Sequence, residues 1–95
     1  MPNDWKKAIE IYYGRIELDN KDIKELFACK DNAAIRLKRP VQEEMAKQKI
    51  LPWKAGNVNT EVAFKVWGLD IADIERRYLK LMKFREKEEK HESAG

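Results

Sequence analysis

Apolar residues recur at helical spacing in several short stretches of the chain, separated by polar residues suited to helix starts and turns. Asn3 or Asp4 can cap a first helix, and Asp19 or Asn20 can cap a second. Polar and apolar residues alternate over residues 15–18, which predicts a short strand between these two helices.

Two helical stretches meet between residues 21 and 41. Their apolar positions form two separate periods: Ile23, Leu26 and Phe27, then Ala34, Leu37 and Val41. Residues 28–32 between them are too small and polar to join either core stripe. Two helices joined by such a sharp turn form a helix-turn-helix.

Pro40 lies inside the second of these helices. Proline disfavours the α conformation at the residue before it and removes a backbone donor. The helix therefore either kinks there or ends, with Pro40 in the first turn of a new helix that begins with acidic residues. We favour one kinked helix to about Lys49, because a single apolar stripe crosses the proline: Ala34, Leu37, Val41 and Met45.

The last third of the chain predicts a further strand and two more helices. An extended segment from Ile50 leads to a turn at Gly56-Asn57 and a short strand. Thr60 can cap a brief helix and Asp70 a long final one. The final helix carries an apolar stripe of Ile71, Ile74, Tyr78 and Leu81.

The predicted organisation is one domain over residues 1–85 and a charged, disordered tail over residues 86–95, which contain no core residues. The fold class is mainly α with a short two-stranded wing. It corresponds to a winged helix-turn-helix with an extra N-terminal helix and a long C-terminal helix.

Charge is concentrated in the middle of the chain. The 95 residues carry a net charge of +3, and residues 28–54 alone hold seven cations and three anions, a net charge of +4. Such a local excess is what a phosphate-binding surface requires.

The chain has a single cysteine, Cys29, which suits a reducing compartment. Its start does not resemble a secretory signal, and no apolar run approaches the roughly 20 residues needed to span a bilayer. We therefore expect the protein in the cytoplasm.

Catalytic chemistry is poorly supplied. The only histidine and the only serine, His91 and Ser93, lie in the polar tail, far from Cys29 in sequence. One cysteine and one distant histidine do not make a zinc site, and the four scattered glycines form no phosphate loop. We therefore expect no enzyme activity, no cofactor or metal, and no small-molecule substrate.

Nucleic-acid binding is better supplied. With Ala34 and Leu37 facing inward, about 100° per residue brings Asn32, Arg36 and Arg39 together on the outward side. Asparagine pairs with adenine and arginine with guanine in the major groove. Lys30 at the turn and Lys38 on the flank suit phosphate contacts, whereas Glu43 would repel the DNA backbone.

The three tryptophans could either stack on nucleic-acid bases or pack within the protein. Trp5, Trp53 and Trp67 each stand beside other apolar residues. Packing in the core or at the domain edge is therefore the prediction for all three.

The order of elements from Arg15 to Trp67 resembles the small winged-helix domains of phage and transposon excisionases and of MerR-type regulators. The resemblance is carried by residues 16–18 leading into 22–27, then residues 29–37, then residues 58–61. It implies DNA binding, with a recognition helix in the major groove at Lys30, Asn32, Arg36 and Arg39, and a wing over residues 54–57 with Lys54 at its start. Transcription regulation or an excisionase-like role in a phage or mobile element would follow.

An interaction or assembly module is the second hypothesis. Ile71, Ile74, Tyr78 and Leu81 can pair the final helix with a copy of itself or with another protein, or pack it onto its own domain. A small dimeric adaptor of phage DNA packaging would combine both hypotheses. The corresponding partners are duplex DNA, a second copy of the chain, and a recombinase or packaging protein.

Overall fold

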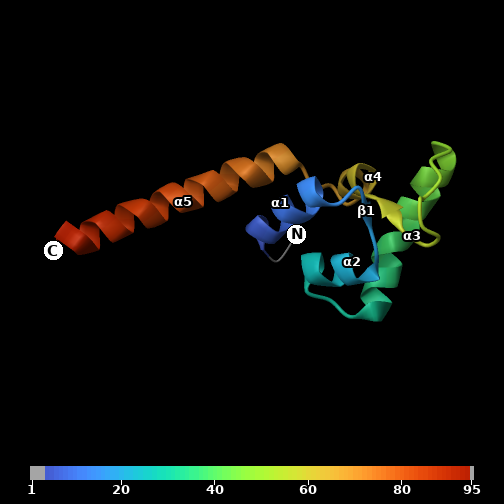
Figure 1. The fold of residues 1–95 in the computed structure, drawn as a ribbon, viewed down its shortest axis with the longest axis horizontal. Coiled ribbons are helices and arrows are strands. Elements are labelled where there is room, and N and C mark those ends of the chain that lie inside the picture. The colour runs from blue at the N-terminus through green and yellow to red at the C-terminus, as the bar shows by residue number, and fades with distance from the viewer. Residues whose placement is uncertain (1–3, 95) are drawn as a thin grey trace.

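Five helices and a two-stranded antiparallel sheet make up the part of the chain that this computed structural model describes, residues 4–94, with side chains to residue 88. In chain order they are α1 (Trp5–Gly14), β1 (Glu17–Leu18), α2 (Asn20–Phe27), α3 (Asp31–Lys47), β2 (Val58–Asn59), α4 (Thr60–Val66) and α5 (Ile71–Ala94) (Figure 1). The expected mainly helical class with two short strands is confirmed.

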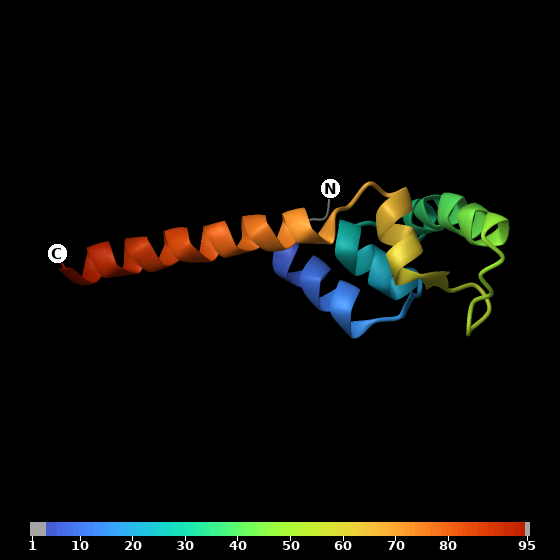
Figure 2. The ribbon, with the colours of Figure 1, turned by 90° about the horizontal axis from the view of Figure 1, so that it is seen from above.

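The first four helices and the sheet form the body of the molecule, and α5 leaves it as a single projecting helix (Figures 1 and 2). The chain measures 57 × 25 × 19 Å along its principal axes. Only the first part of α5 packs on the body, where it contacts α1. α3 lies at the other end of the molecule (Figure 1).

Polar side chains start most of the helices, largely as predicted. Asp4, Asp19 and Asp70 each accept hydrogen bonds from backbone N–H groups of the following turn. Asn59 caps α4, one residue before the predicted Thr60. The Thr60 hydroxyl instead donates to the carbonyl oxygen of Arg15 at 2.7 Å, so it ties α4 to the segment before β1.

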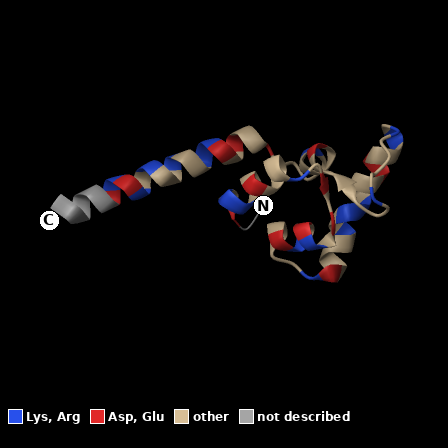
Figure 3. Cartoon of the chain, in the orientation of Figure 1, with Lys and Arg blue, Asp and Glu red and all other residues tan. Residues whose placement is uncertain are grey.

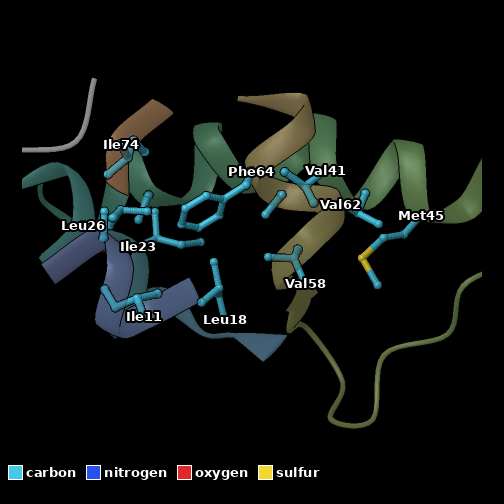
Figure 4. Packing of buried hydrophobic residues seen from close by; sticks show 13 residues of the cluster. Ile11, Leu18, Ile23, Leu26, Val41, Met45, Val58, Val62, Phe64 and Ile74 are labelled. Carbon is cyan, nitrogen blue, oxygen red and sulfur yellow. The ribbon is translucent and has the colours of Figure 1, made fainter. Parts of the chain in front are cut away.

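Apolar side chains from all of these elements meet in one core (Figure 4). The largest side chains that are fully buried are Phe64, Leu18, Ile23, Leu26, Val41 and Val58. Ile74 at the start of α5 joins them, at 6% exposure. The core therefore lies between α2, α3 and α4 and is closed at one side by α1 and α5.

The sheet joins two segments 40 residues apart in sequence. Leu18 pairs with Val58 and Glu17 with Asn59. The expected extended segment from Ile50 forms no strand and is a loop that leads from α3 to β2. The two short strands were predicted near these positions, and they pair with each other.

Pro40 neither ends α3 nor starts a new helix, since α3 is a single helix from Asp31 to Lys47. Pro40 is exposed and Val41 is fully buried. The carbonyl group left without a donor by the proline can therefore be hydrated, while the buried stripe holds the helix in place. α3 ends slightly before the predicted Lys49, whose φ of 58° is left-handed.

The segment from residue 86 was predicted to lack regular structure, whereas α5 continues as a helix to Ala94. Glu and Lys alternate at short spacing there. Opposite charges three or four residues apart stabilise an exposed helix without any core contact. The sequence prediction relied on the absence of core residues and gave no weight to these charges.

We expect Asp19→Ala to destabilise the protein by about 1 kcal/mol, because Asp19 and Asp22 cap the start of α2 reciprocally. Asp19→Asn should retain most of the stability, since asparagine also caps. The N–H of Asp22 lowers the pKa of Asp19, so the charged form contributes stability above the ordinary aspartate pKa that is lost as pH falls through the lowered value. Chemical unfolding near neutral and at acid pH would measure both effects, and equal stability of the alanine and asparagine variants would contradict the capping role.

Candidate nucleic-acid interface

A three-residue turn, Ala28 to Lys30, joins α2 to α3. Ala28 is in the left-handed region, with φ 51° and ψ 49°, and ends α2. The N–H of Cys29 donates to the carbonyl of Lys24 at 3.1 Å, and the backbone of Lys30 is extended at the start of α3. The chain thus reverses sharply at the position predicted from sequence.

The turn is fixed from both sides. Lys24 of α2 forms an ion pair with Asp31 of α3 at 2.8 Å, and this hydrogen bond raises the pKa of Lys24. Cys29 is half-buried and packs against the core. The angle between α2 and α3 is therefore held by both polar and apolar contacts.

The outward side of α3 carries the three side chains that the sequence placed there. Asn32, Arg36 and Arg39 are all exposed, while Ala34 on the opposite side is fully buried. The guanidinium Nε of Arg36 donates to the backbone carbonyl of Asn32 at 3.4 Å. This weak contact leaves the remaining donors of Arg36 available to a ligand.

Neighbouring side chains extend this outward side. Lys30 is exposed at the start of α3, and Ile35 is 46% exposed beside Asn32. Glu43 is exposed one turn beyond Arg39. The cationic part of the face therefore lies between Lys30 and Arg39 and ends where the carboxylate of Glu43 begins.

Lys38 does not have the free flanking position that was predicted. It is half-buried, and its Nζ donates to the side-chain oxygen of Asn20 at 2.9 Å. A Cβ atom on Gly56 would lie 3.8 Å from the same Nζ, so the loop after α3 passes close to it. Lys38 links α3 to the start of α2 close to that loop, so it does not take the phosphate-contact position predicted for it.

Lys54 is exposed at the tip of the loop between α3 and β2. The N–H of Asn57 donates to the carbonyl of Lys54 at 3.0 Å, and the positive φ of Gly56, 87°, is the conformation this turn requires. The carboxylate of Glu17 accepts the N–H groups of Trp53, at 2.6 Å, and of Lys54, at 3.3 Å. β1 thereby positions the loop that carries Lys54.

The prediction that all three tryptophans pack on the domain is wrong for Trp53, which is 80% exposed. Leu51 in the same loop is 84% exposed. Trp5 and Trp67 pack against the core, and Trp67 Nε1 donates to the carbonyl of Leu37 at 2.9 Å. Pro52 lies between these two exposed residues and favours a loop, which was the sequence signal against packing of Trp53.

The apolar stripe of α5 is used largely by the protein itself. Ile74 is buried in the core, and Ile71 packs against it. Tyr78 and Leu81 are half-buried and line a groove of about 600 Å³ between the start of α1 and α5. The large apolar side chains that α5 leaves exposed are three others, Leu79, Met82 and Phe84.

Among the residues with described side chains, no group of three His, Cys, Asp or Glu could hold a metal ion. His91 and Ser93, the residues weighed for catalysis, lie outside those side chains. No described helix combines the length and apolar character needed to cross a membrane. Comparison with family models, with curated proteins and with solved structures found no match.

We expect Lys38→Met to lower the free energy of unfolding by about 1 kcal/mol, because the Asn20 side chain then loses its hydrogen-bond donor. Lys47→Met is the matched control, since Lys47 is exposed on the same helix and should change stability by less than about 0.5 kcal/mol. Equal denaturation midpoints for both variants would show that the hydrogen bond of Lys38 to Asn20 does not stabilise the fold.

Proposed function

We propose that the protein is a winged helix-turn-helix protein that binds double-stranded DNA in a sequence-specific manner, with α3 entering the major groove. The observation that carries this proposal is the exposure of Asn32, Arg36 and Arg39 together on one side of a helix whose other side is buried. Side chains of these types pair bidentately with adenine and guanine.

The spacing of the three side chains suits this role. Asn32 and Arg39 are seven residues apart, about 10 Å along the helix axis. That distance corresponds to about three base-pair steps of B-DNA. Glu43 follows Arg39 by one turn and limits the contact to the first half of α3, because its carboxylate would repel phosphates.

Phosphate contacts would come from the edges of this surface. Lys30 is exposed at the helix start and Lys54 at the tip of the loop that β1 holds in place. In this proposal the loop acts as the wing. Its tip carries one exposed lysine, Lys54, so it would orient the protein on the DNA more than it would add affinity. A small regulator or excisionase-like factor of a phage or mobile element is the role that fits one domain with one such surface.

We expect Arg36→Ala to lose about 1–3 kcal/mol of discrimination between a selected site and a random duplex. Arg36→Lys is the sharper variant, because it keeps the positive charge and removes the planar fork. It should lose the same discrimination while the salt dependence of binding stays that of the wild type. The site would first be selected from random duplexes, binding would be measured by fluorescence anisotropy, and circular dichroism would confirm the fold.

Two outcomes would contradict this function. A wild-type protein without salt-sensitive affinity for any duplex at low salt would end it, because phosphate contacts impose that sensitivity. Unchanged discrimination in the folded Arg36→Lys variant would remove the assigned base contact.

A second candidate function is assembly, for which α5 supplies the specific observation. The helix extends from the body and exposes Leu79 (60%), Met82 (39%) and Phe84 (57%). Leu79 and Met82 lie three residues apart on the same side of the helix, and adjoining exposed apolar side chains favour a protein interface. A self-associating adaptor, such as one for phage DNA packaging, would use this part of α5 instead of the predicted Ile71 and Ile74.

If assembly is the function, the wild-type chain should scatter light as a dimer or larger species. Replacing Leu79, Met82 and Phe84 by serine should convert it to a monomer. Ile74 would be left intact, because its loss opens a core cavity. A wild-type monomer at high concentration would exclude this candidate.

A further inference from the structure

A line of positive charge runs along α5, apart from the surface described on α3. Residues 76–85 contain five cations and no anion. Lys and Arg colour much of this projecting helix blue in Figure 3. At about 100° per residue, three of these cations fall within an arc of about 60° together with Lys87, which follows Glu86. We call them the α5 cationic stripe: Arg76, Lys80, Lys83 and Lys87.

The stripe faces away from the body. Ile74 and Tyr78 point to the opposite side of the helix, toward the core and α1, and all four cations are exposed. The stripe extends over 12 residues, which is 11 steps along the helix or about 16 Å. It is therefore a straight row of charges that the protein does not cover.

The row is unfavourable for the helix itself. Arg76 and Lys80, and Lys83 and Lys87, are four residues apart, a spacing at which like charges destabilise a helix by a few tenths of a kcal/mol. Arg76 is partly neutralised by an ion pair with Asp73. Among the described side chains, Lys80 and Lys83 form no ion pair. A row of anions against this face would remove the repulsion.

The partner must be anionic and need not be apolar. An amphipathic helix that lies on a lipid surface inserts its apolar face into the membrane. In α5, Ile71 and Ile74 on that face are already packed against the core, and Tyr78 faces α1. Leu79, Met82 and Phe84 are also exposed, but at about 100° per residue they fall on both flanks of the stripe and so form no single apolar face. Regularly spaced phosphates are the simplest complement to the row of cations between them.

We propose that the α5 cationic stripe is a second contact site for the phosphate backbone of duplex DNA, independent of base sequence. The proposal extends the DNA-binding function proposed above and rests on it. In this arrangement α3 reads bases, and α5 adds affinity at a distance from the reading helix. The affinity from α5 is the same for every sequence, because phosphates carry no base information.

The test uses Lys80→Gln/Lys83→Gln in the full chain. Glutamine is a good helix former, so circular dichroism should be unchanged. Lys6→Gln/Lys65→Gln is the matched control: it removes two exposed cations, from α1 and α4. Binding to a selected site and to a random duplex of equal length would be measured from about 50 to 200 mM salt.

The stripe variant should lower the slope of log affinity against log salt by about 1.8, about 0.9 for each lost phosphate contact. The preference for the selected site should not change, and the control should keep the wild-type slope. A slope equal to that of the wild type, with site preference intact, would overturn the α5 proposal and leave the function of α3 standing.

The reverse result separates the two proposals. A reduced slope without any site preference in the wild-type protein would support the stripe and overturn base reading by α3. If the wild type binds no duplex but binds vesicles of phosphatidylserine, and Lys80→Gln/Lys83→Gln abolishes that binding, the partner is a membrane surface and the DNA proposal fails.

Discussion

Burial of one side of α3 determines which of its side chains reach solvent. Ala34 and Val41 are completely buried and Met45 nearly so, against α2, α4 and β2. A rotation of the helix by a third of a turn would expose these residues and bury Arg36 or Asn32, at a large cost in both hydrophobic and polar free energy. The proposed recognition surface is thus a consequence of the core, although its side chains lie outside the core.

Helix starts, the turn between α2 and α3 and the outward position of Asn32, Arg36 and Arg39 were predictable from sequence. Each depends on local rules: a cap within three residues, or a periodicity within one helix. The continuity of α3 through Pro40 was predictable for the same reason, because burial of the apolar stripe on both sides of the proline outweighs one missing hydrogen bond.

The remaining features depend on contacts that spacing does not encode. Lys38 meets Asn20, 18 residues away, and Glu17 binds the backbone of Trp53, 36 residues away. The cationic stripe of α5 becomes visible only when charge is compared around the helix and not along the sequence. The acidic ends of the helix, at Asp73 and beyond Arg85, hide the cations between them in any sum over the whole helix.

The exposed indole of Trp53 gives the molecule an intrinsic optical probe. Trp67 stacks edge-on against Phe27 at 5.1 Å between ring centroids, and Trp5 packs against the core, so Trp53 is the tryptophan most accessible to soluble quenchers. Its backbone is fixed by Glu17, close to Lys54. Occupancy of the loop region can therefore be followed by tryptophan emission without attaching a dye.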